Sequence, residues 1–148
     1  MATGLRPHAP ALRIERRDDR PMTVDAYRPG ACNIGPFELA RRRRSAVAFT
    51  LLAVVVAGVI LASGLPVVAR LGVFPFAAAA AITWLQVGRR FCVAFAAIGI
   101  RNFGRRSDAE TIDDPEAVAA DRWTALRMVI EGCLYGALVT AALLVIPT

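Results

Sequence analysis

The chain has 148 residues, of which 56% are hydrophobic and 20% are charged. Average soluble domains contain about 45–50% apolar and about 25% charged residues, and here Arg70 is the single charge between residues 45 and 88. This distribution excludes a disordered chain and a disulfide-rich secreted module, and it predicts an integral membrane protein of one domain. The net charge is +6 and all 18 basic residues are arginine. Because they flank apolar segments, membrane topology explains them and we expect no nucleic-acid partner.

Residues 1–35 are expected to form a polar, mobile cytoplasmic tail ahead of a membrane domain at 36–148. The tail is rich in proline and charge and shows no helix or strand period. A helix start follows, because Pro36 suits the first helical position and Glu38 suits the first turn. Four arginines come next, and we expect them to contact anionic lipid or an acidic partner: Arg41, Arg42, Arg43 and Arg44.

Two apolar segments are then predicted to cross the membrane as helices. The first, residues 45–64, has no charge, and at about 1.5 Å per residue it spans roughly 30 Å, which matches the hydrocarbon core of a bilayer. The second, residues 67–88, contains Pro75, which either starts a helical stretch beginning at Phe74 or kinks a longer helix. Small residues four apart make candidate packing faces on the first segment: Ala53 with Ala57, and Gly58 with Ala62.

Residues 89–104 follow the second span and include ten consecutive apolar residues between arginines. Ten residues are too few to cross a bilayer, so the segment predicts a helix lying on the cytoplasmic membrane surface. Arg89 and Arg90 then mark the exit from the membrane and join the contact with anionic lipid or a partner. The alternative is one helix from 75 to 100 that holds both arginines inside the bilayer, where charged side chains are costly.

A polar connector at 105–127 leads to the third span at 128–146. Asp114 followed by Pro115 is typical of a helix start, and this helix is expected to continue into the span. On the third span, Gly132 and Gly136 are four apart and favour close helix packing, either within the chain or with a partner.

Glu131 is the one ionisable residue well inside a predicted span. We expect its carboxylate to reach water or to pair with Arg127, one turn earlier on the same helix. The alternative is a buried ion pair with Arg89 or Arg90, which would hold the second and third spans together.

Seventeen arginines lie before the first span or after the second, and one lies between these spans. The positive-inside rule therefore places the N-terminus and the whole segment 89–127 in the cytoplasm, and three crossings place the C-terminus outside. The expected fold is an all-α membrane protein with three transmembrane helices and one cytoplasmic-side interfacial helix.

Reactive side chains are scarce. His8 is the single histidine and lies in the tail, so we expect neither a metal site nor a bound cofactor. Cys32, Cys92 and Cys133 all fall near the cytoplasmic leaflet in this topology. One alternative is that the three thiols bind a soft metal ion, and another is that an acyl chain modifies Cys92. The favoured interpretation is that the three cysteines are small, reduced, unreactive residues.

The favoured function is therefore a non-enzymatic one: an accessory subunit of a membrane complex, or a scaffold that binds copies of itself. The expected partners are the lipid bilayer and another membrane protein or a second copy. One alternative is an oligomeric transport or channel component, in which polar residues of the second helix line a pathway: Pro75, Thr83, Gln86, Arg89 and Arg90. A membrane enzyme using the thiols or Glu131 is the third hypothesis. Two segments, 32–36 (CNIGP) and 90–95 (RFCVAF), stand out from the alanine-rich background, but no activity can be attached to them.

Overall fold

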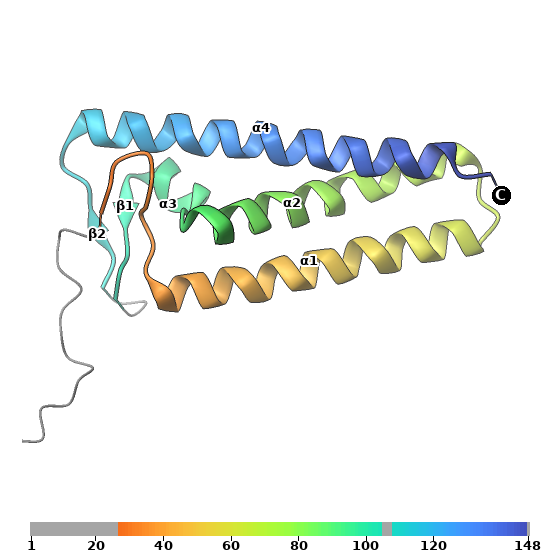
Figure 1. Ribbon diagram of the computed structural model, residues 1–148, viewed down its shortest axis with the longest axis horizontal. Coiled ribbons are helices and arrows are strands. Elements are labelled where there is room, and N and C mark those ends of the chain that lie inside the picture. Colours follow the sequence, from red (N-terminus) through yellow and green to blue (C-terminus); the bar gives the residue numbers. More distant parts are fainter. Residues whose placement is uncertain (1–26, 105–107, 148) are drawn as a thin grey trace, which may run out of the picture.

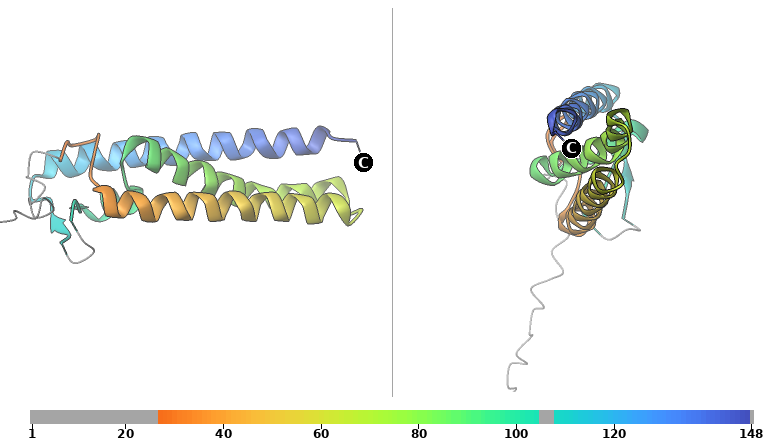
Figure 2. Two further views of the ribbon diagram at one scale, coloured as in Figure 1. Left: turned by 60° about the horizontal axis from the view of Figure 1, so that its bottom comes forward. Right: turned by 90° about the vertical axis from the view of Figure 1, so that its right-hand side faces the viewer.

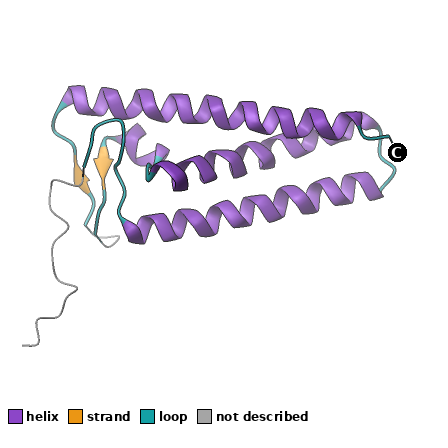
Figure 3. Cartoon of the chain, in the orientation of Figure 1, coloured by secondary structure: helices purple, strands orange, loops and turns teal. Residues whose placement is uncertain are grey.

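The computed structural model describes residues 27–104 and 108–147, and most of these residues are helical. Three long helices run side by side (Figures 1 and 3). The elements in chain order are α1 (Pro36–Ala62), the 3-10 helix η2 (Val67–Val73), α2 (Phe74–Arg89), α3 (Val93–Ile98), β1 (Ile100–Arg101), β2 (Glu110–Thr111) and α4 (Pro115–Val145).

The three long helices form a row with α2 in the middle (Figure 2). One side of α2 packs against α1 and the other side packs against α4. Three helical stretches are long and apolar enough to cross a membrane: Pro36–Ala62, Val67–Arg89 and Pro115–Val145. Most large apolar side chains of the two outer helices point away from the protein, an arrangement compatible with a multi-pass membrane protein.

Each long helix starts where a proline removes an N–H group that would have no partner in the first turn. The predicted starts of α1 at Pro36 and of α4 at Pro115 are confirmed. The side chain of Asp114 caps α4 by accepting a hydrogen bond from the backbone N of Glu116 at 2.9 Å. Pro75 lies in the first turn of α2 and is therefore a helix start and not a kink.

The second helix ends sharply at Arg89. Arg90 adopts the left-handed conformation, with φ 51° and ψ 42°, and the backbone N of Phe91 donates to the carbonyl of Gln86 at 3.0 Å. The alternative of one continuous helix from 75 to 100 is therefore wrong.

The segment predicted as an interfacial helix at 89–104 is mostly not helical. Its helix, α3, has only six residues. This helix packs against α4, and Phe91, Cys92 and Ala96 of the segment are fully buried. Ile100 and Arg101 then form the strand β1, which pairs with β2 in antiparallel register. The fold is thus mostly helical, and the strand pair adds two residues on each side to the expected set of helices.

One predicted boundary also changes. The helix start expected within the 105–127 connector is present at Pro115, while residues 105–107 lie outside the described part. The polar segment placed at 1–35 ends in a packed region, because Asn33 and Ile34 are buried. Residues 1–26 of the predicted tail, including His8, lie outside the described residues. We call the end of the molecule that holds residues 27–35 and 90–114 the capped end.

Candidate functional site

The two unusual sequence segments, 32–36 and 90–95, meet at the capped end. The side-chain amide of Asn33 donates from Nδ2 to the carbonyl of Cys92 at 3.1 Å, and its Oδ1 accepts from the backbone N of Cys92 at 2.7 Å. Both residues are fully buried. Backbone hydrogen bonds extend the contact, since Gly35 donates to Asn102 and Asn102 donates to Asn33. Asn33 therefore satisfies two backbone groups that follow the end of α2.

A buried carboxylate fixes the chain just before Asn33. Asp121 of α4 has no exposed surface and accepts hydrogen bonds from the backbone N of Gly30 at 2.6 Å and from the hydroxyl of Tyr27 at 3.2 Å. Thr124 donates from Oγ1 to the carbonyl of Gly30 at 2.8 Å. Gly30 has φ +69°, and a Cβ there would lie 3.2 Å from Thr124 Oγ1, so glycine suits both the backbone and the space. Burial and the neighbouring Asp121 charge raise the pKa of Tyr27 to about 12.

The thiol of Cys92 lies within the same cluster. Its Sγ accepts hydrogen bonds from Arg42 Nη2 at 2.8 Å and from the backbone N of Phe95 at 3.4 Å. Burial raises the pKa of the Cys92 thiol, and the contacts with Phe95 and Arg42 offset only part of this effect. Arg42 is itself tied to Glu38, through Nε to Oε1 at 3.1 Å, so the start of α1 is linked to the start of α3.

The other two cysteines do not join Cys92 in a metal-ligating group. Cys32 contacts the carbonyl of Ile34 at 3.8 Å, and Cys133 lies on α4 with part of its surface exposed. Among the described residues, no three His, Cys, Asp or Glu side chains are grouped so that they could hold a metal ion.

Of the two expectations for Glu131, the pair with Arg127 is wrong, whereas a solvent-accessible carboxylate agrees with its 39% exposed side chain. Glu131 Oε2 accepts from Arg89 Nη2 at 2.6 Å, which links α4 to the end of α2 as the alternative supposed. This pair is not buried, because 43% and 39% of the two side chains are exposed. Arg127 instead places its guanidinium group 5.0 Å from the ring centre of Trp123, a cation–π distance. The end of α2 brings Arg89 to the Glu131 carboxylate, a contact that spacing along α4 does not reveal.

The two sets of small residues have different surroundings. Gly132 and Gly136 are buried against α2: a Cβ on Gly136 would lie 2.7 Å from the Cα of Ala78, and a Cβ on Gly132 would contact Ile82. On α1, Ala53 and Ala57 are half-buried on the side that faces α2. Gly58 and Ala62 are exposed, and a Cβ on Gly58 would meet no atom within 4 Å.

The polar residues proposed to line a transport pathway make contacts within the chain. Thr83 is buried and donates to the carbonyls of Ala79 and Ala80, while the side chain of Gln86 accepts from the backbone N of Val93 at 3.3 Å. Because α2 ends at Arg89, the crossing helix that this hypothesis requires is absent from the described residues.

Four arginines at the start of α1 divide into two pairs. Arg41 and Arg42 both bind Glu38. Arg43 and Arg44 are exposed and form no hydrogen bond or ion pair with any other described residue. They line a shallow groove along α1 together with Pro36, Leu39, Ala40, Val47, Ala48 and Leu51.

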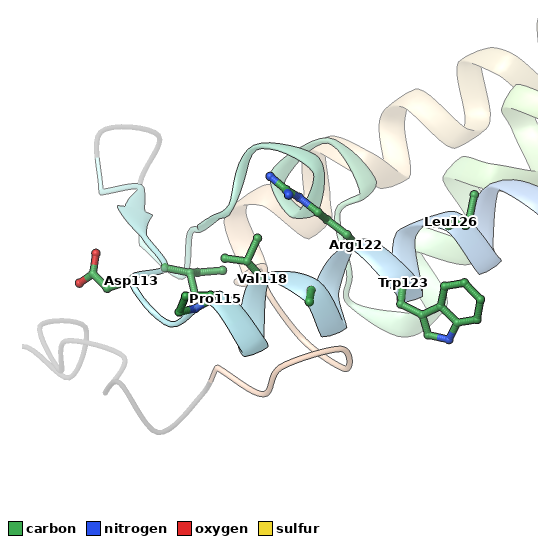
Figure 4. A pocket seen from close by; sticks show the side chains of 8 residues that line it. Asp113, Pro115, Val118, Arg122, Trp123 and Leu126 are labelled. Carbon is green, nitrogen blue, oxygen red and sulfur yellow. The ribbon is translucent and has the colours of Figure 1, made fainter.

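A second shallow groove lies at the start of α4 (Figure 4). Arg122 and Trp123 leave the helix in different directions along this groove, and Asp113 stands at its far end. Its other lining residues are apolar or small: Ile112, Pro115, Val118, Ala119 and Leu126. An aromatic ring beside arginines is typical of the boundary between membrane and water.

Arg70 lies at the opposite end of the molecule and is 3% exposed. Its Nη1 donates to the carbonyls of Leu143 at 2.8 Å and Ile146 at 2.7 Å. These carbonyls belong to the end of α4, where the helix itself supplies no donors. Arg70 therefore joins the turn after α1 to the last turn of α4.

Sequence reasoning missed Asn33, Arg70 and Asp121 as structural polar residues. A signal for Asp121 was present, because it occupies one position in a stripe of small and apolar residues at helical spacing. The buried stripe on α4 is Ala117, Asp121, Ala125, Met128, Gly132, Gly136 and Thr140. Asn33 lay within the 32–36 segment that stood out by composition.

Comparisons with protein-family models, with curated proteins and with solved structures gave no match to this chain.

Proposed function

We propose that the chain is a multi-pass membrane protein with its capped end in the cytoplasm and its C-terminus outside. The support is the distribution of charge between the two ends. Arg43, Arg44 and Arg90 are exposed at the capped end, whereas Arg70 at the opposite end is buried against α4 carbonyls. An excess of exposed arginine on one side is the usual mark of the cytoplasmic face.

The proposed function is binding of another membrane protein or of a second copy, along the outer side of α1. The observation that carries this proposal is the one-sided packing of α1. Only 6% of the residues in its most apolar stretch are buried, compared with 22% for α4 and 33% for Val67–Arg89. Because α1 packs on α2 from one side of the row, its opposite side is uncovered (Figure 2).

The shape of this uncovered side favours a helix as the partner. Gly58 has open space around it, and Val54 and Val59 beside it are 64% and 59% exposed. A small residue between larger ones forms a notch in which a second helix can approach closely. The comparable residues on α4, Gly132 and Gly136, already contact α2. We therefore place the partner at Gly58, and the proposed role is that of an interaction subunit and not of a catalyst.

Photo-crosslinking in native membranes tests this proposal. A benzophenone probe is attached to a single introduced cysteine, Val54→Cys, beside the Gly58 notch, in a chain with Cys32→Ala and Cys133→Ala; Cys92 is retained because it is buried. The matched variants are Ala53→Cys, which faces α2, and Leu138→Cys, which is 67% exposed on α4.

We expect a protein adduct from position 54 and none from positions 53 or 138. The mass of the adduct distinguishes a second copy from a different protein. The proposal is wrong if position 54 reacts only with lipid, or if position 138 gives the same adduct in equal yield, because that result would mean random collision in the membrane.

A further inference from the structure

We propose that the start of α1 holds one anionic phospholipid, with its phosphate between Arg43 and Arg44 and an acyl chain along Val47 and Leu51. The inference rests on the proposed membrane location but not on the proposed partner at Gly58. Arg44 and Gly58 are about 21 Å apart along the helix, so the headgroup and the partner contact are separate.

The division of the four arginines is the first step. Arg41 and Arg42 neutralise the buried Glu38, with Arg41 Nη2 2.7 Å and Arg42 Nε 3.1 Å from Oε1. Arg43 and Arg44 are exposed and have no acidic partner among the residues that the structure describes. Two adjacent, unneutralised guanidinium groups attract an anion, and their planar donors suit phosphate oxygens.

The surface next to these arginines is the second step. The groove continues from Arg43 and Arg44 to Val47 and Leu51, one and two turns further along the helix. Val47 is 44% exposed and Leu51 is 60% exposed. Along this face, charge at the membrane boundary is therefore followed directly by apolar surface at membrane depth.

A phospholipid combines the same two features in the same order, a phosphate followed by an apolar chain. An acidic soluble protein would match the arginines but would leave Val47 and Leu51 without a partner, because they lie on the membrane side of the arginines. The groove therefore fits an anionic lipid better than an acidic protein.

Native mass spectrometry of the full chain tests the site. The purified protein is stripped of lipid in detergent and titrated with phosphatidylglycerol, and with phosphatidylcholine for comparison. The test variant is Arg43→Gln with Arg44→Gln. The matched control, Arg90→Gln with Arg122→Gln, removes two other exposed charges at the capped end. A third variant, Arg43→Lys with Arg44→Lys, keeps the charge.

We expect one phosphatidylglycerol to bind the wild type in preference to phosphatidylcholine, and the Gln pair at 43 and 44 to weaken this binding about 30-fold, given the attraction of each arginine to anionic lipid. The control pair should bind within about threefold of the wild type, a difference that corresponds to less than one arginine contact. The Lys pair should bind more weakly than the wild type but more tightly than the Gln pair, because it keeps the charge without the planar donors. In a separate variant, Val47→Trp should weaken binding by filling the groove without changing the charge.

Equal weakening by the test and control pairs would overturn the site, because it would show general attraction to a positive surface. Unchanged phosphatidylglycerol binding by the test pair would overturn the site as well. Unchanged phosphatidylglycerol binding by the Val47→Trp variant would also overturn it. Carbonate extraction reports membrane integration independently. Release of the wild type by carbonate would refute the membrane location itself, whereas retention without a preference for phosphatidylglycerol would refute only the lipid site.

Discussion

The side-chain amide of Asn33 forms two hydrogen bonds with the backbone of Cys92, one as a donor and one as an acceptor. It joins the segment before α1 to the segment after α2, and both residues are completely buried. The amide pairs both the N–H and the C=O group of Cys92. A side chain at position 33 that lacks either a donor or an acceptor therefore cannot form both hydrogen bonds.

Replacing Asn33 with Ala should therefore destabilise the protein strongly. Two buried backbone groups of Cys92 would lose their partner, and each costs about 1–3 kcal/mol when left unpaired. Thermal unfolding in detergent measures the loss. Asn102→Ala is the matched control, because Asn102 is equally buried but its Oδ1 has no hydrogen-bond partner among the described residues. Equal shifts of the two unfolding midpoints would contradict the role of Asn33.

The Cys92 thiol should react much more slowly with alkylating reagents than the Cys32 thiol. Cys92 is buried, and burial raises its pKa, so less of the reactive thiolate is present at neutral pH. Cys32 is partly exposed. Iodoacetamide labelling followed by peptide mass spectrometry gives both rates in the same sample. Complete unfolding should make them similar, and comparable rates in the folded protein would contradict the buried position of Cys92.

The hydroxyl of Tyr27 should ionise near pH 12 in the folded protein, above the ordinary value of 10.0. Since the folded pKa is the higher one, this contact stabilises the fold fully below pH 10 and stops doing so as the pH rises through 12. Tyr27 and Tyr135 are the two tyrosines of the chain, so a Tyr135→Phe variant isolates the ultraviolet signal of Tyr27. Adding Asp121→Asn should lower the midpoint, and an ordinary midpoint without that change would refute the contact.

Breaking the pair of Arg89 and Glu131 should have a small effect. The two side chains are 43% and 39% exposed, and partly solvated ion pairs contribute about 0–1 kcal/mol. Arg89→Glu and Glu131→Arg should each lower the unfolding midpoint slightly, and the double reversal should restore it. If the double variant is no more stable than the single ones, the pair does not contribute.

An isoleucine should be tolerated at Gly58 but not at Gly136. At Gly136 even a Cβ would lie 2.7 Å from the backbone of Ala78, so the larger side chain must separate α2 from α4. At Gly58 nothing lies within 4 Å. We expect Gly136→Ile to lower the unfolding midpoint of the monomer by several degrees or to prevent folding, at a cost of about 1–3 kcal/mol or more. Gly58→Ile should leave the monomer unchanged and reduce only adduct formation at α1.

The sequence alone was enough to predict three long apolar helices and the prolines that start them. These properties are local: hydrophobic length decides whether a helix can cross a bilayer, and a proline at the first turn needs only its own missing N–H. The break after Arg89 was predicted as the favoured alternative for a similar reason, because charged residues interrupt an apolar run.

The tertiary structure decided which polar groups meet. Arg89, and not Arg127, binds Glu131 because the end of α2 lies beside α4, and Asn33 belongs to the packed domain because residues 90–95 turn back to it. The same holds for small residues, since Gly136 is covered by α2 while Gly58 is open, although their sequence settings look alike. Contacts between segments far apart in the chain depend on how the helices pack, which spacing along a single helix does not encode.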